Sequence, residues 1–311
     1  MAEMILHHYD GSLFSEKIRA IFGYKKLPWR SVIIPPIMPR PHLMPLTGGY
    51  RRTPVMQVGA DVFCDTHVIT EYIEDAHPEH DLHPAGFAFA VRALTQRADT
   101  HLFQVVVALC FQPKAVETML AALGPEMAAK FAADRAELSK GGPGVTRMEP
   151  AIAEACLHDE LVWLETQLSA TDWVCGPHPS LADFAVYHCL WLLRNNREVR
   201  GLLTPYAGVR DWMARIGGFG HGTPSDLSAE DALEIGRAAE PMALKVTSGH
   251  LPAGIKVGDR VTVMPVDYGF NPVAGRLDYC TAHACGVLRD DPVAGAIRAH
   301  FPRTGFRIDA A

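Results

Sequence analysis

The spacing of apolar residues changes period within residues 51–75. Val55 and Val58 stand before a Gly-Ala-Asp turn, and Val62 and Phe63 stand after it. This arrangement is typical of two short strands joined as a hairpin. After residue 65 the apolar positions take helical spacing, which predicts one buried helix face. These positions are Val68, Ile69, Tyr72 and Ile73. We therefore predict a strand, a turn, a second strand and a helix.

The first 34 residues predict a strand, a helix and another strand. Residues 4–9 have the pattern of the first strand and residues 29–34 that of the second. Between them, an Asp-Gly-Ser turn at 10–12 precedes a helix that ends near Gly23. Its apolar residues recur at helical spacing, at Phe14, Ile18, Ile21 and Phe22. Followed by the hairpin and its helix, this order favours a small mixed sheet covered by helices.

The middle of the chain has two contrasting stretches. Residues 35–50 are too rich in proline for a regular helix, so we expect a stiff loop. Residues 85–240 have helical spacing throughout, with breaks at Gly and Pro. Ser180 and Asp183 form a capping box before an almost wholly apolar helix, and Ser228 and Asp231 repeat the motif. We predict a helical bundle domain here.

The last stretch, residues 245–309, changes character again. Its apolar residues alternate in short runs that are separated by Gly, Pro, Asp and Asn. Such runs favour a small β-barrel or sandwich. We expect this tail to fold separately from the rest of the chain.

Composition and charge exclude several classes of function. The chain of 311 residues has 29 Lys plus Arg against 35 Asp plus Glu, a formal charge of −6, and no long basic run, so nucleic acid is not an expected partner. The longest apolar stretches, such as residues 102–111, are too short to cross a bilayer. The seven cysteines are scattered without a C-x-x-C pair, which favours free thiols in a reducing compartment. We expect a cytosolic protein.

Two elements of the 51–75 stretch have candidate binding chemistry. Asp65 and Thr66 stand where a helix cap belongs, and the free amides of a helix N-terminus favour an anion such as a carboxylate. Thr53 and Pro54 open the first strand of the hairpin. A cis bond there would turn the backbone of Thr53 outward, where it could pair with a peptide-like ligand.

These elements resemble the thioredoxin-like domain of glutathione transferases. The family's pattern places a basic residue, an apolar residue and Pro before the hairpin, and an acidic or amide residue with Ser or Thr after it. Arg52, Thr53, Pro54, Asp65 and Thr66 occupy those places, with Thr53 departing from the usual Val or Ile. The resemblance implies a thioredoxin-like α/β domain at 1–82 and an all-helical domain at 85–240. It does not cover the β tail at 245–309.

The resemblance also implies which hydroxyl activates the thiol. The segment SLFSEKIR is similar to the family's first-helix signature, which places Ser12 on the catalytic serine or cysteine position, with Leu13 in place of the usual proline. A hydroxyl at that helix end can donate to a thiolate and stabilise its charge, but Ser12 can equally serve only as a cap. Tyr9, at the end of the first strand, is the rival. Ser15, one turn into the helix, is a weaker third candidate. Of the two adjacent basic residues, Arg52 fits the position that binds a peptide carboxylate, because neighbouring strand residues point to opposite faces.

We interpret the chain as a glutathione-dependent transferase that activates the glutathione thiolate for attack on an electrophilic small molecule, in the manner of detoxification enzymes. The family implies a homodimer. Two alternatives remain open: a non-catalytic glutathione-binding or regulatory module, and a glutathione-dependent isomerase or dehalogenase. Three histidines, His77, His80 and His83, have the spacing of metal ligands, but they lie in an expected interdomain linker and we assign no metal.

Overall fold

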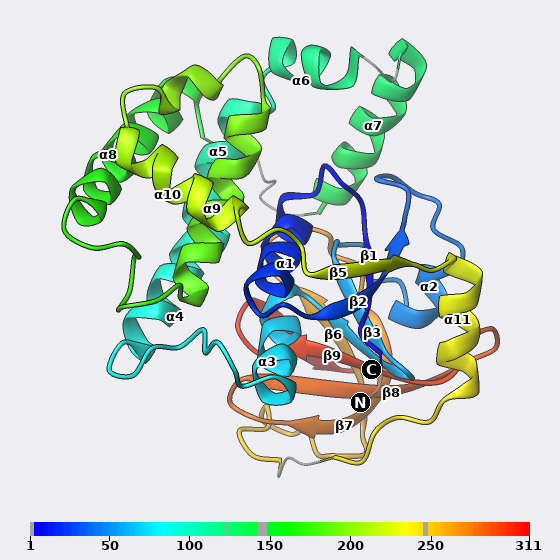
Figure 1. Cartoon of the computed structure of the whole chain (residues 1–311). Helices are drawn as coiled ribbons and strands as arrows, with labels where there is room; N and C mark the ends of the chain where they lie inside the picture. The colour runs from blue at the N-terminus through cyan, green and yellow to red at the C-terminus, as the bar shows by residue number, and fades with distance from the viewer. Residues whose placement is uncertain (1–2, 122–123, 142–147, 245–247) are drawn as a thin grey trace.

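A computed structural model describes residues 3–121, 124–141, 148–244 and 248–311. Figure 1 shows a long sheet with helices on both of its faces and a helical unit beside it. The first unit consists of β1 (Ile5–His8), α1 (Leu13–Tyr24), β2 (Pro28–Ile33), α2 (Leu43–Thr47), β3 (Val55–Val58), β4 (Asp61–Cys64) and α3 (Thr66–Ala76). The expected strand, helix, strand, hairpin and helix are all present. This is the thioredoxin-like arrangement.

A short helix, α2, forms where the proline-rich stretch had predicted only a loop. Pro45 stands in its first turn, where a backbone N–H would have no partner within the helix, so the missing donor costs little. Gly48 ends the helix with φ of 70°, a left-handed conformation that glycine adopts without strain, and its N–H donates to Met44 O at 2.9 Å. The loop prediction was therefore wrong for these residues.

The helical unit follows the predicted capping signals. Ser180 caps α9 (Leu181–Asn195), where its backbone N–H donates to the carboxylate of Asp183 at 2.9 Å and completes the capping box. The same carboxylate accepts from Trp212 Nε1 at 2.9 Å, which connects α9 to α10 (Ala207–Gly217). The helices of this unit are α4 (Ala88–Arg97), η1 (Ala98–Leu102), α5 (Phe103–Cys110), α6 (Pro113–Leu120), α7 (Gly124–Ser139), α8 (Pro150–Leu168), α9 (Leu181–Asn195), η3 (Arg200–Leu203) and α10 (Ala207–Gly217).

Part of the stretch that was expected to be helical forms a strand of the sheet. Residues 223–226 form the edge strand β5 (Thr223–Asp226), which pairs in parallel with β2. Pro224 is tolerated because an edge strand does not need every N–H for the ladder. Helix α11 (Ala229–Ala238) then begins at Ser228, whose side chain accepts from Asp231 N at 3.0 Å, as the second capping motif predicted.

The C-terminal stretch is all β, as predicted, but it does not form a separate sheet. Its strands are β6 (Arg260–Pro265), β7 (Val273–Cys280), β8 (Ala284–Asp291), β9 (Gly295–Pro302) and β10 (Phe306–Ala310). Strand β9 pairs in parallel with β4, so one ten-stranded sheet runs in the order β10-β6-β7-β8-β9-β4-β3-β1-β2-β5. The tail therefore shares its sheet with the first unit, whereas a small barrel or sandwich of its own had been predicted. Residues 1–2 and 245–247, where two of the expected units begin, lie outside the described residues.

Two cores lie on the two faces of this sheet. On one face, α1 and α3 pack toward the helical unit, and Leu6 of β1 belongs to this core. On the other face, α2 and α11 lie together (Figure 1), and the neighbouring residue Ile5 packs there with residues of the C-terminal strands. Successive strand residues point to opposite faces. The tail thus completes the core of the first unit on its second face.

A buried charge cluster fastens β9 to β4. Asp61 is 0% exposed and accepts from Arg298 Nη1 at 3.0 Å, His300 Nε2 at 2.8 Å and Met242 N at 2.7 Å. His300 Nδ1 lies 2.7 Å from the hydroxyl of Tyr279. Every charged group at this junction therefore has a partner, which burial requires.

Candidate functional site

The hairpin and the start of α3 meet at one small cavity. The Thr53–Pro54 peptide bond is cis. Arg40 Nη1 donates to Thr53 Oγ1 at 3.0 Å and to the carbonyl of Arg51 at 2.8 Å, which fixes the turn before β3. Thr53 and Pro54 both line the cavity. The turn therefore holds backbone groups at a place that a ligand could reach.

Asp65 caps α3 in a strained backbone conformation. Its φ is 106°, a region that residues other than glycine rarely adopt, and its carboxylate accepts from His67 N at 3.0 Å. Burial raises the pKa of Asp65, against the influence of the nearby Arg52. Backbone strain of this kind is commonly found at binding sites. The cap predicted from sequence is therefore present.

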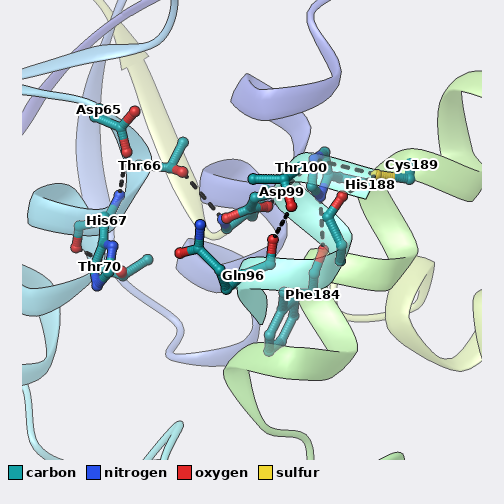
Figure 2. Close-up of polar contacts among 12 residues, drawn as sticks. Asp65, Thr66, His67, Thr70, Gln96, Asp99, Thr100, Phe184, His188 and Cys189 are labelled. Carbon is teal, nitrogen blue, oxygen red and sulfur yellow. Dashed lines mark hydrogen bonds and ion pairs between the residues drawn. The ribbon is translucent and has the colours of Figure 1, made fainter. Parts of the chain in front are cut away.

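A buried lysine stands beside the start of α3. Lys17 of α1 is 1% exposed, and its Nζ donates to Thr66 Oγ1 at 3.1 Å and to Asp99 Oδ2 at 2.6 Å. Figure 2 shows the chain of contacts that leads from Thr66 to Asp99 of η1, and the separate contact of Asp65 with His67. Burial raises the pKa of Asp99, and its other oxygen has no hydrogen-bond partner among the described residues. The ammonium adds positive charge where the amides of α3 already favour an anion.

The histidines around this chain of contacts are neutral. Arg92 Nη1 donates to His67 Nε2 at 2.9 Å, so that nitrogen has no proton, and burial lowers the pKa of His67 to about 3. His188 lies beyond Asp99 in Figure 2, with its Nδ1 3.3 Å from the carbonyl of Phe184. Burial lowers the pKa of His188 well below its usual value. The positive charge near Thr66 therefore comes from Lys17 and not from imidazolium.

The cavity brings together most of the residues that sequence had singled out. Its volume is about 90 Å³, and its lining includes Arg52, Thr53, Pro54, Asp65 and Thr66. It also includes groups that sequence reasoning had not named: Gln96, Asp99 and Thr100 from the helical unit, and Asp267, Tyr268 and Phe306 from the C-terminal stretch. Three parts of the chain therefore build one site.

The two candidate hydroxyls do not line this cavity. Ser12 is buried and caps α1, where its Oγ accepts from Ser15 N at 3.2 Å. Tyr9 follows β1, and its carbonyl accepts from Ser12 N at 3.1 Å. The hydroxyl of Ser12 has accepted one bond and retains its own proton for donation. The predicted cap at Ser12 is therefore present.

Arg52 is already occupied by the C-terminal stretch. Its Nη2 donates to the carboxylate of Asp267 and to the carbonyl of Tyr268, and its guanidinium lies 3.8 Å from the centre of the Tyr268 ring. A guanidinium at this distance from an aromatic face is stabilised by cation–π attraction. The arginine that the resemblance assigns to a ligand carboxylate thus binds a carboxylate of its own chain.

The three spaced histidines do not come together as metal ligands in the described residues. His83 lies instead with Glu74 and Asp81, whose potential ligand atoms are within 4.8 Å of one another. Lys25 Nζ lies 2.5 Å from Glu74 Oε1. An ammonium in that place already supplies the positive charge that the carboxylates attract.

Some of the cavity residues that sequence analysis did not name had a recognisable signal in the sequence, and others had none. Lys17 falls on the apolar stripe of its helix, three residues after Phe14 and four before Ile21, and a lysine on a buried face is a signal that could have been noticed. Asp99 is one of several acids on a helical stretch and has no such signal. Asp267 and Tyr268 are more than 200 residues away from Arg52 in the chain, and no local pattern connects them.

Comparisons with known proteins agree with this architecture. Residues 6–81 match the model of the glutathione S-transferase N-terminal domain, and residues 114–215 match that of the glutathione S-transferase C-terminal domain. A GST-like protein from Pseudomonas syringae is 37% identical, with a TM-score of 0.83, and the similarity covers 100% of both chains, the C-terminal strands included. The comparison with curated proteins gave no match.

More distant structures share the fold alone. A glutathione S-transferase from Rhodospirillum rubrum F11 is 18% identical with a TM-score of 0.51, over 69% of this chain and 87% of that one. FzlA from C. crescentus is 21% identical with a TM-score of 0.50, over the same shares. Across the described residues, no helix is both long and apolar enough to cross a membrane. From its two domain matches and its full-length relative, the chain belongs to the glutathione S-transferase family.

Proposed function

We propose that this protein binds glutathione at the cavity between β3 and α3 and activates its thiol for attack on an electrophilic small molecule. The observation that carries the proposal is the convergence of Thr53, Asp65 and Thr66 on one cavity beside the buried ammonium of Lys17. The γ-glutamyl carboxylate would bind the first amides of α3, and its ammonium would lie near Asp65. The peptide backbone would pair with Thr53, as an added strand does.

The thiol must ionise to react. A free thiol has a pKa of about 8.5 and is only a few per cent thiolate at neutral pH. A hydroxyl that donates to the sulfur, together with the amides at the start of α1, would lower that pKa. We propose Ser12 for this role, with Tyr9 as the alternative. A serine cannot form a mixed disulfide, which favours conjugation or elimination over disulfide reduction.

The thiol assignment is tested by the thiolate absorbance of bound glutathione against pH. If Ser12 donates to the sulfur, Ser12→Ala should raise the pKa of the bound thiol by about one unit or more, since a hydrogen bond to the charged form is lost. Ser15→Ala, which removes a hydroxyl one turn along the same helix, should leave the curve in place. A curve that moves only in Tyr9→Phe would transfer the role to Tyr9. A curve that moves in neither variant would leave the amides of α1 as the activating group.

The binding assignment is tested separately by calorimetric titration with glutathione. Asp65→Ala should weaken binding by about 1–3 kcal/mol, the range for a lost hydrogen bond to a charged group. Asp75→Ala removes an exposed acid farther along the same helix and serves as the matched control. Equal affinity in the wild type and Asp65→Ala would refute the placement of the γ-glutamyl end.

A second candidate function is a non-catalytic glutathione-binding module. It is favoured by the position of the two candidate hydroxyls, because neither Ser12 nor Tyr9 lines the cavity. Binding of glutathione without turnover on a panel of electrophiles would support it. Consumption of glutathione together with an electrophile would support the transferase instead.

We further propose a cytosolic homodimer. All seven cysteines lie within the described residues as free thiols, which suits a reducing compartment, and the dimer is an expectation from the family. Sedimentation equilibrium measures the dimer directly. A monomer at micromolar concentration would contradict it.

A further inference from the structure

The loop between β6 and β7 lies over the cavity. Within this loop, residues 266–272, Asp267 and Tyr268 both contact Arg52 and both line the cavity. Arg52 has a side chain that is 10% exposed, whereas that of Asp267 is 50% exposed. The carboxylate therefore reaches the guanidinium from the solvent side and does not belong to the buried core.

The same loop also contacts the helical unit across the cavity. Gly269 N donates to the carbonyl of Leu138 in α7 at 2.7 Å, and the Tyr268 ring lies 6.2 Å from that of Phe103 in α5. At its base, Val266 N donates to the carbonyl of Gly305 at 3.0 Å. The loop is therefore held at three places, on the thioredoxin-like unit, on the helical unit and on its own sheet.

The cavity beneath the loop is too small for a tripeptide. Its volume is about 90 Å³, whereas pockets that enclose small-molecule ligands usually have about 300–1,000 Å³. On the same measure of volume, one water molecule needs about 10–15 Å³. The site as it stands accordingly has room for several waters or for a single carboxylate group.

The contacts of Arg52 indicate what would open it. A ligand carboxylate and the Asp267 carboxylate are the same chemical group, so one can replace the other on the guanidinium without leaving a charge unpaired. The strands that flank the loop, β6 and β7, would stay fixed, because they pair with each other and each also pairs with a second strand, β6 with β10 and β7 with β8. Opening then requires movement of the loop alone.

We propose that Asp267 and Tyr268 form an intramolecular latch, which competes with the carboxylate of a peptide thiol for Arg52 and admits only ligands that can displace it. The latch itself is defined by contacts within this chain, and its ligand rests on the proposed function. It makes the C-terminal strands part of the binding site. It also selects for anionic ligands, since a neutral molecule offers no replacement for Asp267.

The latch predicts an increase in affinity when Asp267 loses its charge. In the full-length chain, Asp267→Asn should bind glutathione about tenfold more tightly than the wild type, because a larger fraction of molecules is already open. Tyr268→Ala should act in the same direction, since it removes the ring over the guanidinium. Asp290→Asn removes an exposed acid from β8 and should leave the affinity unchanged. Calorimetric titration with glutathione measures all four proteins.

Hydrogen exchange tests the latch without any ligand. The Gly269 amide should exchange severalfold faster in Asp267→Asn than in the wild type or Asp290→Asn, because its bond to Leu138 is made only when the loop is closed. Unchanged exchange would overturn the latch, and so would faster exchange with equal or weaker binding of glutathione in Asp267→Asn. Faster exchange in a protein that binds no glutathione in any form would support the latch and refute the proposed function.

Discussion

The junction between β4 and β9 can be tested through Arg298. This arginine is 8% exposed and binds Asp61 at 3.0 Å and Asp278 at 2.8 Å. The substitution Arg298→Met keeps most of the aliphatic side chain and removes the charge. Asp61, which is fully buried, then retains only Met242 N and His300 as partners.

The expected cost follows from the burial of Asp61. Breaking a buried ion pair typically costs about 3–5 kcal/mol, because the remaining charge stays buried without compensation. Two of the three contacts to Asp61 survive in Arg298→Met, so we expect the lower end, about 3 kcal/mol. The double variant Asp61→Asn/Arg298→Met removes both charges and should be more stable than Arg298→Met by about 2 kcal/mol.

The variant should also gain a pH dependence. Burial lowers the pKa of His300 in the native protein, and the charge of Arg298 lowers it further, against the influence of Asp61. Without Arg298 the pKa of His300 should rise, since its protonated ring can then pair with Asp61. A raised native pKa stabilises the fold at low pH and loses that contribution as the pH rises. The loss of unfolding free energy in Arg298→Met, relative to the wild type, should therefore be smaller at pH 6 than at pH 8.

Urea unfolding of the wild type, both single variants and the double variant measures these free energies. Arg298→Lys serves as the control that keeps the charge. Two results would contradict this prediction. One is a loss of less than about 1 kcal/mol of unfolding free energy in Arg298→Met, and the other is a double variant that is no more stable than Arg298→Met. Either result would mean that the ion pair does not hold the two strands together.

Three further predictions follow from other parts of the molecule. A chain that ends after Glu240 should be insoluble, because β4 loses its neighbour β9 and the core on the face of α2 and α11 loses the side chains of β6–β10. A soluble truncation that binds glutathione would contradict this prediction. Burial lowers the pKa of His7 to about 4, so the protonation of this histidine in the unfolded chain should remove about 2 kcal/mol of stability between pH 7 and 5, in addition to what the other buried histidines contribute. His7→Asn should reduce the fall in stability by that amount in urea titrations, and an equal slope would refute the reasoning. Lys17→Met should lower the free energy of unfolding by about 2–3 kcal/mol, because Asp99 loses its ion pair. The same change should weaken glutathione binding at α3, and Lys26→Met, at an exposed lysine, is the control.

Local patterns were sufficient to predict the elements and their ends. The α1 stripe, the hairpin and α3 each depend on residues that are close in the chain, and so do the caps at Ser12, Ser180 and Ser228. The capping oxygen and the amide it binds are two or three residues apart, so the sequence contains both partners. For the same reason, local spacing is enough to assign Asp65 and Thr66 to the start of a helix.

Some short elements and some side-chain partners were harder to predict than the main helices and strands. Pro45 suggested a loop, yet a proline in a first turn is compatible with a helix, and only the position of Gly48 as a C-cap distinguishes the two. Residues 223–226 have no strong strand pattern and are strand only because β2 offers them a free edge. Lys17 stood on a predicted buried face, but its partner Asp99 lies on a helix whose orientation the sequence does not fix.

The tertiary structure alone decided where the C-terminal strands lie and what covers the site. Alternating residues predict a strand, but backbone hydrogen bonds are the same along every strand and do not specify a partner more than 200 residues away. That pairing turned an expected separate tail into the other half of the sheet, and it brought Asp267 and Tyr268 over Arg52. Local spacing was therefore sufficient to predict the family and to name candidate groups for a peptide thiol. The fold determined that one of those groups is already bound within the chain, because that contact depends on long-range packing and not on local spacing.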